Sequence, residues 1–418
     1  MRNHRKLSIL AAILILLVGS VQLVLSDAAP PQQPPGASIE SGGFETNVRM
    51  LSEEVLIVVS VAEEPLDDER INSSDYFQGH VEATFWMQNQ GDETESFDVW
   101  FPLGVEDGSS DVSYIYDFRV WVNGEPAEIG EEELFGRRDF VPWATWPVTF
   151  APDQLVIITV SYDLRPTGYM PYGRFFYYLE TGAGWWGTIG DGTVTVRLPY
   201  DVNHYNVVSY TLSDTFDDFE IDGAEMIWHF TDLEPEGSDN IYVNIMSPSH
   251  WERILAAEEV VAENPDSAEA YLTLAEAQFN GLNWHHGLDC CEDLMAAGVA
   301  SYQQALELAP DNIDIHIGYL NLLLKDWVPW ADISYSEDIP VVIASALALD
   351  PENEELLNLV NQAMLLCKDA MDEWPDSEIY LGAKEDLLTV LEEAIEANPD
   401  NERLLEIYNQ FIAPPESF

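Results

Sequence analysis

Histidine, cysteine and acidic side chains gather in one short segment of the second half of the chain. His285, His286, Asp289, Cys290, Cys291 and Glu292 offer nitrogen, sulfur and oxygen ligands to a metal ion. If the segment is helical, His286 and Cys290 share a face at i, i+4 spacing. Two ligands do not close a metal site, and the sequence shows no second ligand pair. His285, His286, Cys290 and Cys291 are therefore candidate metal ligands, with ordinary helix residues as the favoured interpretation.

Two other segments imitate binding loops. Residues 182–187 (GAGWWG) satisfy the G-x-G-x-x-G spacing of dinucleotide loops, but such a loop must open a helix, and a strand pattern follows at Thr193. Residues 218–223 resemble the start of a calcium loop, yet His229 stands where the bidentate glutamate is required. A strand connection and an Asp-Gly hairpin explain these residues better. We expect no cofactor, and calcium is left open by the acidic composition.

Aromatic residues gather between Phe140 and Trp186. A candidate ligand surface consists of the tryptophans in or beside the expected turns, which are Trp143, Trp146, Trp185 and Trp186. If they are exposed, they form a flat stacking platform for a glycan or for peptide side chains. If they are buried, they close one end of a hydrophobic core, which is the interpretation that we favour.

Catalytic motifs are absent from the sequence. It contains no G-x-S-x-G, no H-E-x-x-H and no cysteine nucleophile with evident partners. Acidic residues are so abundant that the sequence does not single out a pair of carboxylates for glycoside hydrolysis. We expect a protein that is not an enzyme, with a hydrolase as an alternative.

The spacing of apolar residues predicts strands in the first half of the chain and helices in the second. From about residue 41 to 248, short apolar runs alternate with polar residues at a period of two, as in 80–88 and 156–163. Asn123-Gly124 and Asp222-Gly223 are typical of two-residue hairpin turns, because both dipeptides adopt positive φ at low cost. Many such runs with no helical pattern between them predict an antiparallel β-sandwich.

From about residue 249 to 413 the apolar period is that of a helix. Proline-containing turns recur, starting at Asn264, Ala309, Asp350, Trp374 and Asn398. Each would end one helix and cap the next with an Asp, Ser or Asn side chain. Residues 302–310 (YQQALELAP) have the aromatic, alanine and proline spacing of the tetratricopeptide (TPR) repeat, which this half resembles. The turns are unequally spaced, and residues 327–336 look like an insertion. The resemblance implies a TPR-like α-solenoid with a concave face for partners.

The first half has a resemblance of its own. Residues 176–190 (FYYLETGAGWWGTIG), together with the run 84–103, are similar to exported bacterial β-sandwich domains of unassigned function. The likeness covers about residues 84–245. It implies the fold and brings no known chemistry with it.

The N-terminal segment has the order of an export signal. Basic residues at 2–6 precede an almost uninterrupted apolar run, 7–25. Val24 and Ser26 fit the small-residue rule for cleavage before Asp27, but the run is also long enough to remain as a membrane anchor. The proline-rich residues 27–40 then predict a semi-rigid spacer. We expect an extracytoplasmic protein, secreted or anchored, that touches the membrane only through this segment.

The charge balance limits the partners. The chain has 76 acidic and 16 basic residues and a net charge of −60. Such a surface repels nucleic acid and anionic lipid, and it suits solubility, a saline medium, calcium or a basic partner. The three cysteines, Cys290, Cys291 and Cys367, are too few for a disulfide framework, although one bridge from Cys367 to the adjacent pair remains open.

Together these features predict four regions: a signal peptide or anchor (1–26), a spacer (27–40), a β-sandwich domain (41–248) and a TPR-like helical repeat domain (249–413). The predicted function is that of an exported, non-catalytic binding or scaffold protein of the cell envelope with a protein or peptide partner. A carbohydrate-binding surface protein using the aromatic cluster at 140–186 is the first alternative. An uncharacterised hydrolase is the second.

Overall fold

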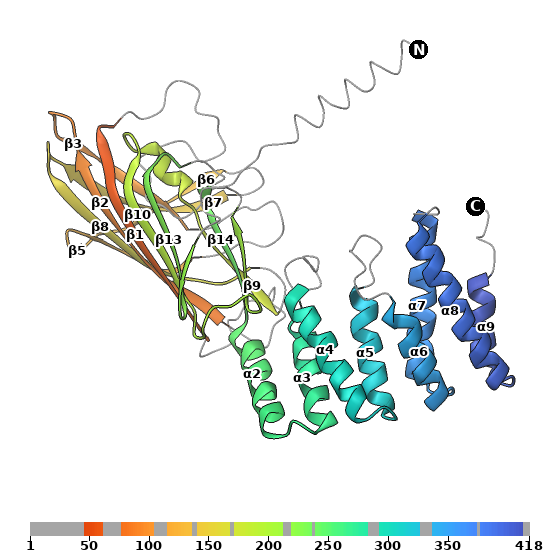
Figure 1. Ribbon diagram of the computed structural model, residues 1–418. Coiled ribbons are helices and arrows are strands. Elements are labelled where there is room, and N and C mark those ends of the chain that lie inside the picture. The colour runs from red at the N-terminus through yellow and green to blue at the C-terminus, as the bar shows by residue number, and fades with distance from the viewer. Residues whose placement is uncertain are drawn as a thin grey trace, which may run out of the picture. The chain divides into compact units, whose positions relative to one another are not determined.

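The chain folds as a β unit followed by a helical unit (Figure 1). The structure is a computed structural model that describes residues 46–61, 77–103, 115–135, 140–167, 171–211, 219–235, 239–282, 292–326, 337–373 and 377–412. Contacts within the chain divide it into two compact units, Met1–Pro248 and Ser249–Phe418. Each unit is described by itself below.

The elements follow one another in two blocks. The strands are β1 (Val48–Val61), β2 (Phe77–Asn89), β3 (Glu95–Pro102), β4 (Ile115–Val122), β5 (Glu125–Pro126), β6 (Gly130–Phe135), β7 (Phe140–Phe150), β8 (Leu155–Leu164), β9 (Tyr172–Tyr177), β10 (Ile189–Arg197), β11 (Val207–Thr211), β12 (Glu220–Asp222), β13 (Glu225–Leu233) and β14 (Ile241–Met246), with a 3-10 helix at Glu180–Gly184 between β9 and β10. The helices are α2 (Pro248–Glu263), α3 (Ala268–Asn280), α4 (Glu292–Leu308), α5 (Ile313–Asp326), α6 (Asp338–Leu349), α7 (Glu354–Glu373), α8 (Glu378–Ala397) and α9 (Glu402–Ile412).

The strands form one large and two small sheets. The large sheet has the order β12-β13-β10-β1-β2-β8-β4-β5, and the small sheets have the orders β11-β14-β9 and β3-β7-β6. Each order is linear, so the sheets are open. Neighbouring strands are antiparallel except β1 and β10, which pair in parallel. The prediction of an entirely antiparallel fold is therefore wrong for the pair β1 and β10. Between these two strands the chain forms eight others, and such a long connection allows it to return parallel to β1.

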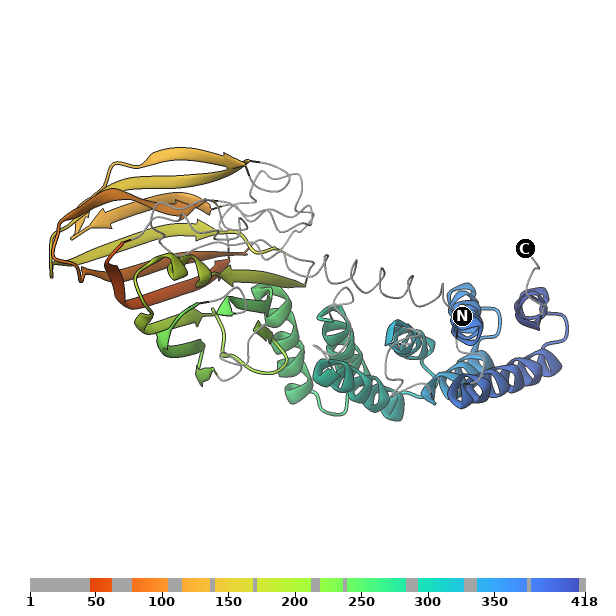
Figure 2. The same cartoon turned by 90° about the horizontal axis from the view of Figure 1, so that it is seen from above.

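The two small sheets cover one face of the large sheet, and side chains from all three enter a single core. Phe101 of β3 lies against Tyr162 of β8, with ring centroids 5.4 Å apart. Phe175 of β9 meets Phe77 of β2 edge to face at 5.8 Å. These contacts place β3-β7-β6 over one part of the large sheet and β9-β14-β11 over another. The β unit therefore has two layers of sheet (Figure 2).

Both predicted hairpin turns are confirmed. Asn123 and Gly124 have φ values of 52° and 81° between β4 and β5, and Gly223 has a φ of 60° between β12 and β13. Positive φ is costly for most side chains and cheap for glycine and asparagine, so these residues set the two turns locally.

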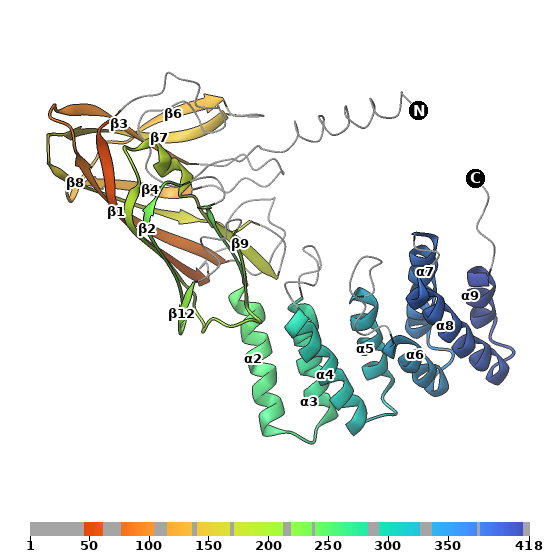
Figure 3. The same cartoon turned by 45° about the horizontal axis from the view of Figure 1, so that its top comes forward.

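The helical unit is built from helices that contact both their neighbours and the helices two positions away. Contacts join α3 to α4 and α7 to α8 along the chain, and they also join α3 to α5, α5 to α7, α7 to α9, and α6 to α8. Figure 3 shows α3 and α4 side by side and α7 close to α8. Apolar stripes on successive helices are thereby buried against one another.

The recurring proline turns cap the helices much as the sequence predicts. The Ser267 hydroxyl accepts a hydrogen bond from the backbone N–H of Ala270 at 3.3 Å. Asn401 accepts one from the N–H of Leu404 at 3.0 Å. Ser377, in contrast, makes no side-chain cap bond to α8. The capping prediction thus holds for α3 and α9 and fails at α8.

Segments 1–45, which include the expected export signal and spacer, lie outside the described residues. Within the ranges that the structure describes, no helix combines the length and the apolar character needed to cross a membrane.

Unpaired acidic charge should make the stability of the protein depend on salt. Ion pairs such as Arg197–Glu225 at 2.6 Å and Arg403–Glu406 at 2.5 Å can neutralise only a minority of the carboxylates, because the chain has 16 basic and 76 acidic residues. Raising KCl from ~0.15 M to ~2 M should increase the Tm by about 5–10 °C, because repulsion between surface carboxylates is screened. CaCl₂ at matched ionic strength separates screening from specific calcium binding. A Tm that does not change in either salt contradicts both.

Candidate functional site

The four tryptophans of the candidate ligand surface do not lie together on the surface. Trp143 and Trp185 are 4% exposed, Trp146 is fully buried, and Trp186 is 48% exposed. The ring of Trp146 packs 6.1 Å from Phe118, so it closes the core between β7 and β4. Trp146 and Trp185 belong to the hydrophobic core of the β unit, whereas Trp143 is buried beside Trp100 outside that core. A flat stacking platform would require all four to face solvent, so an aromatic ligand contact here would rest on Trp186 alone.

The candidate metal ligands His285, His286, Cys290 and Cys291 lie outside the described residues, as does Asp218 of the calcium-like segment. Cys367 is described and is fully buried in α7, where its Sγ lies 3.9 Å from the carbonyl oxygen of Tyr380. Burial raises the pKa of the Cys367 thiol to about 11, against the opposing effect of Lys384. The thiol therefore stays protonated at neutral pH and is a poor nucleophile and metal ligand.

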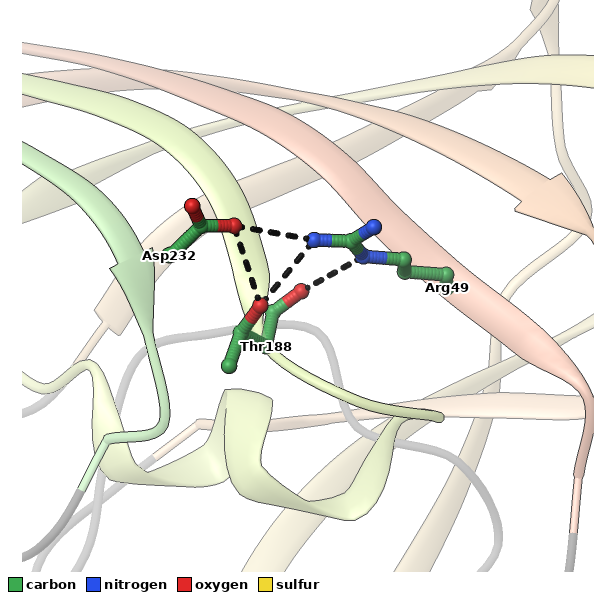
Figure 4. A network of polar contacts seen from close by, with 3 residues as sticks. All are labelled: Arg49, Thr188 and Asp232. Carbon is green, nitrogen blue, oxygen red and sulfur yellow. Dashed lines mark hydrogen bonds and ion pairs between the residues drawn. The ribbon is translucent and has the colours of Figure 1, made fainter.

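The loop that carries Trp186 is fastened to the large sheet by an arginine (Figure 4). Arg49 of β1 donates from Nε to the carbonyl oxygen of Thr188 at 2.9 Å and from Nη2 to the Thr188 hydroxyl at 3.0 Å. The same Nη2 lies 3.3 Å from Asp232 Oδ1 on β13. The backbone N–H of Trp186 also donates to the carbonyl oxygen of Val48 at 2.9 Å. These bonds hold the exposed indole on a rigid support.

A serine, a histidine and an aspartate lie in line on the face of the large sheet that points away from the core. His80 of β2 lies opposite Asp163 of β8, with Nδ1 2.7 Å from Oδ1. Its Nε2 lies 3.3 Å from the hydroxyl of Ser161. The connectivity is that of a nucleophile, a base and an orienting carboxylate. The sequence alone did not indicate this trio, because His80 is far in the chain from Ser161 and Asp163, and only the pairing of β2 with β8 brings it beside them.

Among the described residues, the position of this trio gives no positive evidence for acyl transfer. An oxyanion needs free backbone N–H groups or equivalent donors beside the nucleophile. Ser161 lies in β8, between β2 and β4, where it pairs with Glu82 on one side and Arg119 on the other. The N–H groups of such a central strand are used by the two ladders. The geometry therefore supports an exposed polar cluster and gives no argument for a hydrolase.

A cleft of about 460 Å³ opens between the first turns of α7 and α9. Its lining residues are Glu352, Glu354, Leu357, Asn358, Asp400, Asn401, Glu402 and Arg403. The single arginine of the lining, Arg403, is paired with Glu406. The amide of Asn401 donates to the carbonyl oxygen of Pro351 at 2.7 Å, so it joins the start of α9 to the turn before α7. The cleft is thus built from two tied turns and is strongly negative.

The sequence contains a signal for this cleft in its recurring proline turns. Both walls are the recurring proline turns, 350–353 (DPEN) and 398–401 (NPDN). Their periodic spacing predicted that they cap helices. These two turns lie side by side because α7 contacts α9, although α8 lies between them in the sequence.

Comparison with known proteins gives distant structural likenesses. No family model matches the chain, and no curated protein matches it. A "putative nutrient binding protein" of Legionella pneumophila is 18% identical with a TM-score of 0.40, covering 83% of this chain and 99% of that one. A TPR protein of Thermus thermophilus is 14% identical with a TM-score of 0.25, covering 38% and 71%.

An M1 zinc metallopeptidase of Deinococcus radiodurans is 11% identical with a TM-score of 0.25, covering 82% of this chain and 94% of that one. All three scores are too low to support an argument about activity or ligand. The zinc-binding H-E-x-x-H motif is also absent from the present sequence.

Truncation of Trp146 and of Trp186 should change the stability of the protein by very different amounts. Trp146→Ala should lower the free energy of unfolding by about 3–5 kcal/mol, because it leaves a large cavity in the core. Trp186→Ala should change it by less than about 0.5 kcal/mol, since half of this side chain already meets solvent. Urea unfolding of both variants, followed by circular dichroism, measures the difference. Similar losses for the two variants would contradict the burial described above.

Proposed function

We propose that this protein is an exported binding or scaffold protein whose helical unit is a TPR-like α-solenoid that binds a basic protein or peptide. The observation that carries the proposal is the contact between helices two positions apart: α3 with α5, α5 with α7, and α7 with α9. Such contacts stack alternate helices into one layer, as stacked helix pairs of a solenoid require. One layer then presents a continuous surface to a partner.

The charge of that surface favours a basic partner. The cleft between α7 and α9 contributes carboxylates from Glu352, Glu354, Asp400 and Glu402. Its one cation is already paired with Glu406. A partner with lysine or arginine side chains gains charge-assisted hydrogen bonds there, and the overall charge of the chain speeds its approach.

Export is supported by the N-terminal sequence. The basic residues 2–6, the apolar run 7–25 and the small residues before Asp27 have the order of a signal peptide or anchor. The acidic surface and the few cysteines are compatible with work outside the cytoplasm. The proposed place of action is therefore the cell envelope or its exterior.

Binding of a basic peptide tests the proposed cleft. The full exported chain should bind a labelled extended peptide of alternating lysine and alanine, and it should not bind an equally long glutamate-alanine peptide. Replacing Glu352, Glu354, Asp400 and Glu402 by their amides should weaken binding by about tenfold at ~0.15 M salt, because each lost exposed charge contributes a few tenths of a kcal/mol. Fluorescence anisotropy measures both affinities.

A variant with the same change in net charge supplies the control. Amide replacements at Glu385, Asp386, Glu393 and Glu396, exposed on α8, should weaken binding by less than about threefold. Equal loss in the two variants would mean that the peptide responds to net charge alone. Undiminished binding in the cleft variant would remove the cleft from the proposal.

The processing of the N-terminus tests export separately. Expression of the full chain in a host with a standard secretion pathway should place the protein outside the cytoplasmic membrane. Mass spectrometry of the released protein should find a new N-terminus at Asp27, Ala28 or Ala29. Retention of Met1 in the membrane fraction, with the rest accessible to external protease, would indicate an anchor. Recovery of the uncleaved chain in the cytoplasm would contradict export.

A further inference from the structure

One carboxylate lies inside the hydrophobic core of the β unit. Glu53 is in the middle of β1 and is 2% exposed. A register shift between Met50 and Ser52 changes the alternation of the strand, so that Glu53 shares the core face with Val55. Without this shift, the same residue would point toward solvent.

The neighbours of Glu53 in the large sheet offer it no charge. It lies opposite Phe85 on β2 and Gly192 on β10. The ring of Phe230 lies so close to Gly192 that an added Cβ would stand 2.0 Å from it. This row of the sheet is therefore tightly packed and apolar around the carboxylate.

The polar partner of Glu53 comes from the opposite layer. The hydroxyl of Tyr177, on β9, donates a hydrogen bond to Glu53 Oε1. The second oxygen, Oε2, is buried and accepts no hydrogen bond from any described residue. The hydrogen bond from Tyr177 lowers the proton affinity of Glu53, against the larger effect of burial. A polar bridge therefore joins the two layers through the core.

The proton on Glu53 decides what the burial of its carboxyl group costs. Burial in apolar surroundings raises the pKa of Glu53 from its ordinary value of 4.5 to about 7, while the Tyr177 bond opposes part of this rise. The neutral acid fits an apolar core, since one oxygen accepts from Tyr177. The ionised form leaves an uncompensated charge on Oε2, which is costly in such a place.

The small sheet that carries Tyr177 is also the sheet from which the chain leaves the β unit. Tyr177 pairs with Ile241 of β14. β14 ends at Met246, and α2 begins at Pro248. Any loosening of β9-β14-β11 therefore reaches the segment that leads directly into the helices.

We propose that Glu53 and Tyr177 form a proton-operated latch: the sheet β9-β14-β11 stays packed on the large sheet when Glu53 is neutral, and it loosens when Glu53 is ionised, because the cost of the buried charge on Oε2 exceeds what the strengthened Tyr177 bond contributes. The protein would thereby sense the acidity of its surroundings. This device is independent of the binding function proposed above.

The direction of the pH effect follows from the raised pKa. Because the folded protein holds this proton more tightly than the unfolded chain, its contribution to stability is complete below pH 4.5. It is lost as the pH rises to about 7 and is constant above that. The gap between pH 4.5 and pH 7 corresponds to roughly 300-fold in the folding equilibrium constant.

Urea unfolding between pH 4.5 and 8.5 tests the latch, with Glu53→Gln compared with the wild-type chain in ~2 M KCl to screen the surface acids. The folding constant of Glu53→Gln divided by that of the wild-type chain should rise by roughly 300-fold from the lowest to the highest pH. The matched control is Glu54→Gln, because Glu54 is adjacent but exposed on the other face of β1. The folding constant of Glu54→Gln divided by that of the wild-type chain should not change with pH. Tyr177→Phe should extend the loss of stability to higher pH. A flat ratio for Glu53→Gln, or an equal rise for Glu54→Gln, would overturn the proposal.

Hydrogen exchange of the wild-type protein gives a second measurement that needs no variant. Between pH 5 and 8, after correction for intrinsic rates, protection of the amides in β9, β14 and β11 should fall more steeply than protection in β2 and β8. Equal changes in both layers would show that no latch exists.

Discussion

Large aromatic side chains fill the space between the two layers of the β unit, and most other features of that unit follow from this packing. Phe101, Tyr162 and Trp146 occupy the interior where β3-β7-β6 covers the large sheet. Phe175 does so where β9-β14-β11 covers it. An aromatic side chain between the two layers buries apolar area from both layers at once. In that position it cannot contact a ligand at the surface.

This constraint explains why Trp146 and Trp185 of the aromatic-rich segment are withdrawn from the surface. Trp185 and Trp186 are adjacent, yet the first lies in the core and the second on a loop held by Arg49 and Thr188. The outward face of the large sheet instead carries polar trios and pairs, such as His80 with Asp163. Antiparallel sheets often have one face on the core and one face in water, and these polar residues serve the second face.

The two units manage charge in different ways. In the β unit, the carboxylate of Glu53 lies in the interior and is bonded to Tyr177 from the opposite layer. In the helical unit, carboxylates collect at helix starts, such as Glu354 and Glu402, where the helix dipole favours them. Acid at helix starts is thus explained locally. The meeting of two such starts in one cleft is what makes the surface suitable for a basic partner.

The sequence by itself determined the features that depend on neighbouring residues. The change of apolar period near residue 248, the hairpins at Asn123-Gly124 and Asp222-Gly223, and the cap at Ser267 all follow from local conformational preference. Tertiary structure decided the rest, because it depends on which distant segments meet. The parallel pairing of β1 with β10, the division between buried Trp185 and exposed Trp186, and the turn of Glu53 into the core each arise from packing between layers. No local sequence pattern determines those contacts. An alternation of apolar and polar residues shows that a strand has two different faces, but it does not show which segment covers either face.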